Sequence, residues 1–274
     1  MTVQTNNNNE TKPDSTSGYA AVNGLKMYYE MYGTGKPLVL IHGGGSTIHT
    51  TFGRVIQEFA KSHQVIAVEM QAHGHTTDID RPLSFKQDAD DIATLLKQLN
   101  ISKADIFGFS NGASTTLQFA IRHPEMTNKI IVASTFYKKA GAPGWFWPMM
   151  SKPTFEGMPQ PYKDAFLEIN PDTNALHRMY ERDIARMLDF PDITDDEIKS
   201  IKSPALIILG DRDVATPEHA VQMHRFISNS RLAIIPGGHI DYIGELTTPQ
   251  NSTLIAATIS MINQFLNDPV SKDQ

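Results

Sequence analysis

Cysteine is absent from all 274 residues of the chain. This absence excludes a disulfide framework, a thiolate zinc site, an iron–sulfur cluster and a cysteine nucleophile. The sequence also lacks any run of about 18 apolar residues, so it offers no membrane-spanning helix. Its first residues show neither the basic nor the apolar region of a signal peptide, and we expect a cytoplasmic location.

Positive charge is in short supply as well. Lysine and arginine together number 24 against 30 aspartates and glutamates, and the formal net charge is −6. Nucleic-acid-binding proteins usually carry a basic patch or stripe, so this balance argues against a nucleic-acid partner. Hydrophobic residues make up 40% of the chain, which is ordinary for a globular protein with a large core. The oligomeric state stays open.

Short apolar segments alternate with amphipathic segments along most of the chain. The expected strands are 25–32, 38–41, 65–68, 105–109, 129–133, 205–209 and 232–235, and the expected helices that flank them are 52–60, 85–99, 113–122 and 252–266. This alternation predicts an α/β fold, with a mostly parallel sheet of about eight strands that helices cover on both faces.

The alternation stops near Phe136 and resumes near residue 200. Six of the 16 prolines and both tryptophans fall between residues 141 and 171. We therefore expect a helical lid inserted into one domain, rather than a second independent domain. The predicted segments are a disordered polar tail at 1–17, a first core part at 18–135, the lid at 136–200 and a second core part at 201–274.

A G-x-S-x-G motif spans Gly108–Gly112, between a predicted strand and a predicted helix. This is the setting of a nucleophile elbow, in which glycines flank the serine because the turn is sharp. It predicts that Ser110 exposes its hydroxyl at the carboxyl end of the sheet. A serine hydroxyl is a weak nucleophile at neutral pH and needs an adjacent base. His239, which follows the last predicted strand, is the candidate.

A carboxylate must orient that histidine. The turn after the strand at 205–209 offers two carboxylates, Asp211 and Asp213. The position of the turn alone leaves both of them open.

Backbone donors are needed for the oxyanion that develops during acyl transfer. We predict one donor at the amide of Asn111, at the start of a helix, and the other at Gly44 in a glycine-rich loop. The flanking Gly43 and Gly45 are expected to contact the substrate.

These motifs together resemble the α/β-hydrolase superfamily, over nearly all of the chain after the N-terminal tail. The residues that carry the resemblance are His42–Gly45, Ser110 in G-x-S-x-G, Asp213 in Gly210-x-x-Asp213-x-x-x-Pro217, and His239 in Gly238-His239. The similarity is to small bacterial members with a lid, namely esterases, C–C bond hydrolases, enol-lactonases and cofactor-free haloperoxidases. It implies Asp213 rather than Asp211 as the acid of a Ser-His-Asp triad, and it implies no cofactor and no metal.

Other histidines invite alternative interpretations. His73 and His75 would suit a metal together with His49 or Glu69, but no third ligand has convincing spacing, and we expect no metal site. His42 is expected to stabilise the glycine-rich loop rather than to react.

An aromatic and methionine cluster lies in the insertion. Packing of a lid onto the core accounts for such a cluster, and so does an apolar wall over the Ser110 pocket. We expect Trp145, Trp147 and Met149 to contact an apolar acyl group.

The motifs predict acyl transfer to water, with a small-molecule substrate. The first hypothesis is a serine hydrolase of small to medium carboxylic esters with a largely apolar acyl group. A lactone or enol-lactone hydrolase would use the same residues. A non-enzymatic small-molecule receptor on the same fold is the alternative from a different class. A serine at position 110, in place of an aspartate, argues against the haloalkane dehalogenase and epoxide hydrolase branches.

Overall fold

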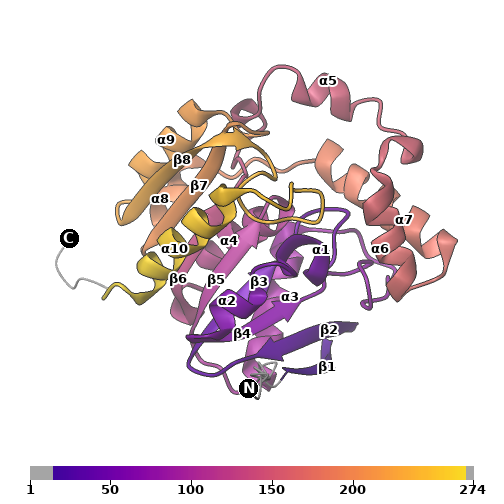
Figure 1. The fold of residues 1–274 in the computed structure, drawn as a ribbon, viewed down its shortest axis with the longest axis horizontal. Coiled ribbons are helices and arrows are strands. Elements are labelled where there is room, and N and C mark those ends of the chain that lie inside the picture. The colour runs from indigo at the N-terminus through magenta and orange to yellow at the C-terminus, as the bar shows by residue number, and fades with distance from the viewer. Residues whose placement is uncertain (1–14, 270–274) are drawn as a thin grey trace, which may run out of the picture.

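A computed structural model of the protein describes residues 15–269. Eight strands form one sheet in the order β1-β2-β4-β3-β5-β6-β7-β8 (Figure 1). The strands β1 and β2 pair antiparallel, and β2 is antiparallel to β4, whereas all other neighbours are parallel. The predicted α/β class with a mostly parallel eight-stranded sheet is therefore confirmed.

The strands are β1 (Ser15–Val22), β2 (Leu25–Tyr32), β3 (Lys36–Ile41), β4 (His63–Val68), β5 (Ala104–Phe109), β6 (Thr127–Ala133), β7 (Ala205–Arg212) and β8 (Ser230–Gly238). The helices are α1 (Ile48–Phe52), α2 (Ile56–Ala60), α3 (Phe85–Gln98), α4 (Asn111–Arg122), α5 (Phe146–Met150), α6 (Gln160–Ile169), α7 (Thr173–Leu188), α8 (Asp195–Ser200), α9 (Pro217–Phe226) and α10 (Thr253–Asn267). Short 3₁₀ turns occupy Pro124–Met126, Lys139–Gly141 and Phe155–Gly157.

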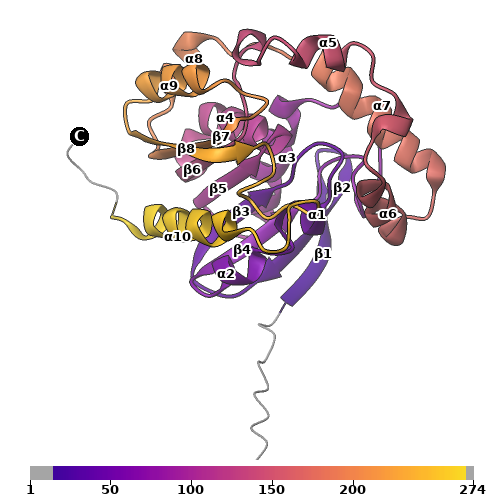
Figure 2. The same ribbon diagram turned by 45° about the horizontal axis from the view of Figure 1, so that its top comes forward.

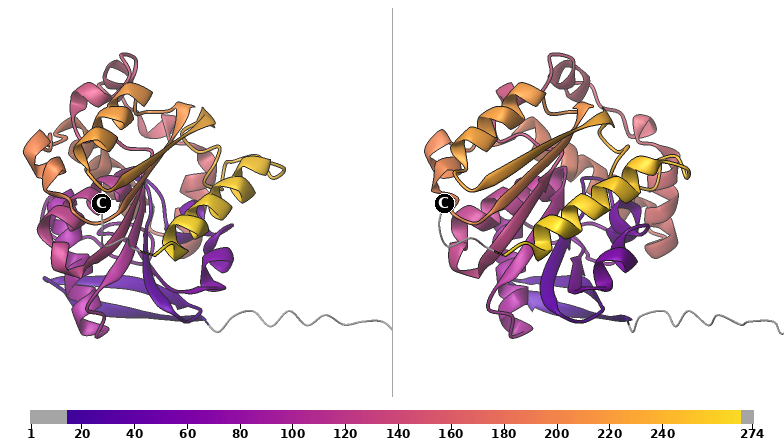
Figure 3. Two further views of the ribbon diagram at one scale, coloured as in Figure 1. Left: turned by 90° about the vertical axis from the view of Figure 1, so that its left-hand side faces the viewer. Right: turned by 60° about the vertical axis from the view of Figure 1, so that its left-hand side comes forward.

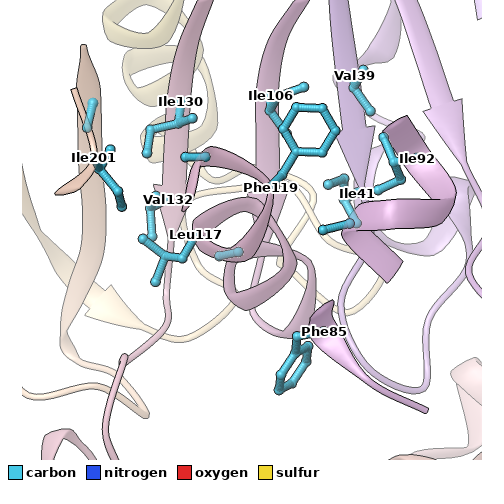
Figure 4. Packing of buried hydrophobic residues seen from close by; sticks show 14 of the residues in the cluster. Val39, Ile41, Phe85, Ile92, Ile106, Leu117, Phe119, Ile130, Val132 and Ile201 are labelled. Atoms are coloured by element: carbon cyan, nitrogen blue, oxygen red, sulfur yellow. The ribbon is translucent and has the colours of Figure 1, made fainter. Parts of the chain in front are cut away.

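Helices cover both faces of the sheet, which is why its central strands are apolar throughout. Successive side chains of a strand point to opposite faces. Leu38 and Leu40 of β3 accordingly join the cluster under α1, α2 and α10, whereas Val39 and Ile41 join the cluster under α3, α4, α8 and α9. Figure 3 shows α10 on one side of the sheet and α9 on the other. Figure 4 shows part of the second cluster, where Phe119 of α4 lies beside the sheet residues.

Two expectations about the N-terminal part need correction. The predicted tail at 1–17 extends too far, because Ser15 already pairs with Tyr32 in the β1–β2 ladder, and residues 1–14 lie outside the described part. The first half of this edge strand has no apolar pattern, so the sequence does not indicate it. The strand is defined by its pairing with β2. The helix expected at 52–60 covers only Ile56–Ala60 as α2, because α1 ends at Phe52 and the chain turns over residues 53–55 before α2 begins.

The segment between β6 and β7 leaves the sheet. Its helices α5, α6 and α7 form an arch to one side of the sheet (Figure 2). The next helix, α8, packs with the core instead, since its Ile198 and the following Ile201 belong to the buried cluster that includes Val39 and Ile41. No helix within residues 15–269 is long and apolar enough to cross a membrane.

One buried lysine ties the last helix to the sheet. Lys129 of β6 is only 4% exposed, and its Nζ donates hydrogen bonds to the carbonyl oxygens of Phe265, Leu266 and Asp268, at 2.7, 2.8 and 2.6 Å. These carbonyls belong to the C-terminal end of α10, where a helix favours positive charge. The ammonium therefore caps α10 and joins it to β6.

Replacing this lysine tests the cap. We expect Lys129→Met to lower the free energy of unfolding by about 2–3 kcal/mol, because three carbonyls lose a charged donor. Urea unfolding gives the value. The exposed Lys103 supplies the control, and Lys103→Met should change stability by less than about 0.5 kcal/mol. Equal effects of the two variants would show that the cap contributes nothing.

Candidate active site

A single residue makes the turn between β5 and α4. β5 ends at Phe109 and α4 begins at Asn111, and the intervening Ser110 has φ 55° and ψ −119°. A non-glycine residue adopts a positive φ rarely, and such strain is characteristic of functional sites. The motif's glycines permit the turn, because a Cβ on Gly108 would overlap the carbonyl oxygen of Gly112, and one on Gly112 would overlap that of Ile41.

The structure brings Ser110, His239 and Asp213 together at the edge where parallel strands end. Ser110 Oγ lies 3.1 Å from Nε2 of His239, and Nδ1 of His239 lies 2.6 Å from Oδ1 of Asp213. With Nδ1–H donating to the carboxylate, Nε2 is the nitrogen that can accept the serine proton. The other candidate carboxylate, Asp211, is half exposed and accepts the amide of Gly237 instead.

Asp213 is held in its charged form although it is buried. Burial raises the pKa of this carboxyl, but the contacts with His239 and Ser134 and with the amide of Gly210 outweigh burial, so the pKa lies below its ordinary value. The reverse balance applies to His239. Burial lowers its pKa, but the adjacent Asp213 carboxylate outweighs this and raises it above the ordinary value. The Asp213 carboxylate therefore stabilises the imidazolium that forms when Nε2 of His239 takes up a proton.

Ser134 holds Asp213 directly and Tyr242 holds Ser134, and neither residue was among the predicted site residues. Ser134 donates a hydrogen bond of 2.5 Å to Oδ2 of Asp213, and its Oγ also lies 2.5 Å from the hydroxyl of Tyr242. Ser134 itself has a positive φ of 57°. No motif marks these residues, and the one available signal is the position of Ser134 at the end of β6, beside β7.

The glycine-rich loop after β3 lies against Ser110. Gly44, Gly45, Ser110 and Asn111 line one cavity, so the two predicted oxyanion donors border the same space as the serine. His42 anchors the loop as expected. Its Nδ1–H donates to the carbonyl of Gly43 at 2.7 Å, its Nε2 accepts the amide of Met70 at 3.1 Å, and burial lowers its pKa to about 3.

A buried carboxylate from the arch also holds this loop. Asp183 of α7 accepts the amide of Gly45 at 2.5 Å and contacts His73 Nε2 at 2.9 Å, and Arg186 pairs with it as well. Arg186 also pairs with Asp88 of α3, at 2.9 Å. The Gly45 amide thereby links the glycine-rich loop to Asp183 of α7, while His73 and Arg186 compensate the charge of this carboxylate. No motif in the sequence predicts this link.

His73 and His75 do not converge on a common point. Each pairs with its own carboxylate, His73 with Asp183 and His75 with Glu69, both at 2.9 Å. Among residues 15–269, no group of three or more histidine and acidic side chains could hold a metal ion.

The cavity beside Ser110 measures about 470 Å³. It lies between the carboxyl ends of the strands and the arch, and its apolar lining consists mainly of Phe136, Phe146, Met149, Met150, Met158, Ile184, Met187, Phe190 and Val214. A cavity of this size suits a small to medium organic ligand.

Of the three side chains expected to form the apolar wall, only Met149 lines this cavity. The expectation for Trp145 and Trp147 is wrong. Trp145 is 53% exposed, and Trp147 packs edge-on against Phe136 while its Nε1 donates to the carbonyl of Lys139. The reason is helical spacing, because residues 146, 149 and 150 share one face of α5.

The remaining predicted contacts divide between two spaces. Gly45 borders the large cavity, whereas Gly43 borders only a smaller adjoining one, of about 220 Å³.

Comparison with known proteins agrees with this geometry. Residues 36–160 match the family model described as alpha/beta hydrolase fold. It is similar to human serine hydrolase BPHL, with 29% identity over 81% of this chain and 79% of that protein. It is also similar to 2-hydroxymuconate semialdehyde hydrolase from Pseudomonas sp. strain CF600, with 30% identity over 58% of this chain and 51% of that protein.

A solved structure shares the same fold. The enol-lactonase from Burkholderia xenovorans LB400 superposes with a TM-score of 0.70 at 24% identity, and the match covers 91% of this chain and 100% of that one. The fold implied by the resemblance of the motifs is therefore confirmed.

The elbow glycine generates a prediction about stability. We expect Gly112→Ala to lower the free energy of unfolding by about 3 kcal/mol or more, because the added Cβ overlaps backbone that cannot yield without moving β3. Chemical denaturation measures this change. Gly144 faces open space, so Gly144→Ala is the matched control and should be close to neutral. A neutral Gly112→Ala would mean that the turn is less tightly packed than described.

Proposed function

We propose that this protein is a serine hydrolase that cleaves small to medium carboxylic esters with a largely apolar acyl group. The observation that carries the proposal is the hydrogen-bonded series from Asp213 through His239 to Ser110, at the wall of an apolar cavity. A serine with a neutral imidazole nitrogen on its hydroxyl and a buried carboxylate behind the imidazole is the arrangement that activates a hydroxyl for acyl transfer.

In the first half of the reaction, Ser110 Oγ attacks the carbonyl carbon while His239 Nε2 takes its proton. The carbonyl oxygen becomes an oxyanion, and the amides of Gly44 and Asn111 donate to it. Asp213 stabilises the imidazolium that has formed. The imidazolium then protonates the departing alkoxide, and the alcohol leaves an acyl group on Ser110.

In the second half, water enters and His239 takes a proton from it. The resulting hydroxide attacks the acyl carbon, the same two amides receive the oxyanion, and the tetrahedral intermediate collapses. The carboxylic acid is released and Ser110 recovers its proton. Each oxyanion donor is worth about 3–4 kcal/mol of transition-state stabilisation in such sites.

In this proposal, the insertion predicted at 136–200 is a lid that supplies the wall of the acyl-binding cavity. Phe146, Met149 and Met150 from α5, with Ile184 and Met187 from α7, give the cavity its apolar surface. Flexible methionines adapt to different acyl shapes, which favours a range of substrates over a single one.

Hydrolysis of a lactone or of a C–C bond is the second candidate. It is favoured by the sequence similarity to 2-hydroxymuconate semialdehyde hydrolase and by the shared fold with an enol-lactonase. The same serine, histidine and aspartate would act in either case, so direct comparison of open-chain esters, lactones and C–C bond substrates separates these activities.

Turnover of a p-nitrophenyl ester series, from acetate to long acyl chains, tests the proposal. We expect the highest kcat/KM for short to medium chains and a loss of at least about 10³-fold in Ser110→Ala. If the wild type is inert but an organophosphonate labels Ser110, the serine is competent and lactones become the next substrates. Turnover by Ser110→Ala equal to that of the wild type would refute the mechanism.

The two neighbouring aspartates provide a sharper prediction. Asp213→Asn should lower kcat by about 10⁴-fold, because the amide no longer fixes the required imidazole tautomer. Asp211→Asn changes the same charge a short distance away on an exposed side chain, and should leave kcat within about threefold of the wild type. Steady-state kinetics on one ester decides between them, and the opposite pattern would reassign the acid to Asp211.

A further inference from the structure

The smaller cavity beside the nucleophile differs in chemistry from the large one. It shares Gly44, Gly45, Ser110 and His239 with its neighbour, so both spaces meet at the reacting groups. Its remaining wall includes Tyr162 from α6 and Glu245 from the segment between β8 and α10. A substrate bound to Ser110 can therefore extend in two directions, and one of them leads to a carboxyl group.

Glu245 is buried, and its nearest positive group is the catalytic His239 rather than a lysine or an arginine. It is 4% exposed, its Oε2 accepts the hydroxyl of Tyr162 at 2.5 Å, and its Oε1 accepts the hydroxyl of Ser46 at 3.3 Å. No lysine or arginine within residues 15–269 forms a salt bridge with it. Burial raises the pKa of this carboxyl, because the hydroxyls of Tyr162 and Ser46 and the nearby His239 offset the loss of hydration only in part.

Asp183, the other carboxyl group on the walls of the two cavities, has its negative charge compensated by positive partners. Asp183 borders the large cavity, but Arg186 and His73 already pair with it and the amide of Gly45 occupies the same oxygen as His73. It has no free charge to offer a ligand. A carboxylate can accept about four hydrogen bonds, and the two hydroxyls on Glu245 fill only part of this capacity. The unfilled capacity borders a cavity that contains the reacting serine.

We propose that Glu245 and Tyr162 form a subsite for a short, ammonium-bearing part of the substrate, while the apolar part occupies the large cavity. A buried carboxylate costs free energy unless a cation pairs with it, and a substrate ammonium supplies that cation on binding. The inference rests on the proposed ester hydrolysis and names the substrate class within it. Esters with an amine two carbons from the ester group should thus be preferred over neutral esters of the same shape.

Isosteric ester pairs test the subsite. One pair carries the amine on the alcohol side, as 2-(dimethylamino)ethyl butyrate against 3-methylbutyl butyrate. The other carries it on the acyl side, as butyl 3-(dimethylamino)propanoate against butyl 4-methylpentanoate. At pH 7 we expect the amine to raise kcat/KM at least about tenfold in one of the pairs, as for a desolvated charge pair.

Substitution of Glu245 tests whether its carboxyl group causes the preference for the amine-bearing esters. In Glu245→Gln the ratio of amine to neutral ester should fall to about one. Asp164 lies on α6 near Tyr162 but faces solvent, so Asp164→Asn is the matched control and should keep the preference. A wild-type ratio near one in both pairs overturns the subsite, as does a preference that survives in Glu245→Gln.

Two additional measurements test the subsite if Glu245→Gln does not fold, and separate a failure of the subsite from a failure of the proposed function. If Glu245→Gln does not fold, inhibition of wild-type p-nitrophenyl butyrate hydrolysis by trimethylammonium and by tert-butanol replaces it, and equal inhibition by the two overturns the subsite. Hydrolysis of the neutral esters, and its loss in Ser110→Ala, tests the proposed function separately. If neutral esters are cleaved without any amine preference, only the subsite fails, whereas no Ser110-dependent cleavage of any ester removes the proposed function itself.

Discussion

The strained turn at Ser110 is the constraint on which the rest of the site depends. A positive φ at a serine costs about 1–3 kcal/mol, so the surroundings must enforce it. They do so from three strands. The Ser110 amide donates to the carbonyl oxygen of Ala133 in β6 at 2.9 Å. Gly108 of β5 packs against the carbonyl of Gly112, and Gly112 packs against the carbonyl of Ile41 in β3. The large buried core of the sheet thus maintains a local conformation that the turn would not adopt alone, and the hydroxyl points where His239 can reach it.

Charge compensation is the second organising feature. Asp213 and Asp183 are both buried and both keep their charge, the first beside His239 and backbone amides, the second beside Arg186 and His73. In a low-dielectric interior such pairing is what makes a carboxylate tolerable. Glu245 lies at the same site, but no lysine or arginine of the described residues pairs with its buried carboxyl group. For this reason we propose it as the group that binds a positively charged ligand.

Local and periodic features of this protein could be predicted from its sequence, whereas contacts between distant segments could not. The elbow is a local motif, and parallel strands bring Asp213 and His239 to the same edge, so the grouping of these residues with Ser110 followed from strand order. Asp183 reaches Gly45 across 138 residues, and Ser134 carries no motif, so neither had a signal. The prediction that Trp145 and Trp147 form the apolar wall was wrong for another reason. Composition shows that a segment is aromatic, but it does not show which face of a five-residue helix turns inward.

Residues of helix α7 have two different structural roles, and this difference determines which substitutions the protein can accept during evolution. Asp183 and Arg186 hold the glycine-rich loop, while Ile184 and Met187 from the same helix only shape the cavity. Substitution of the second pair would therefore change the shape of the cavity, whereas substitution of the first pair would disturb the loop beside Ser110. Sequence drift along this one helix can thus reshape the cavity while the loop keeps its place.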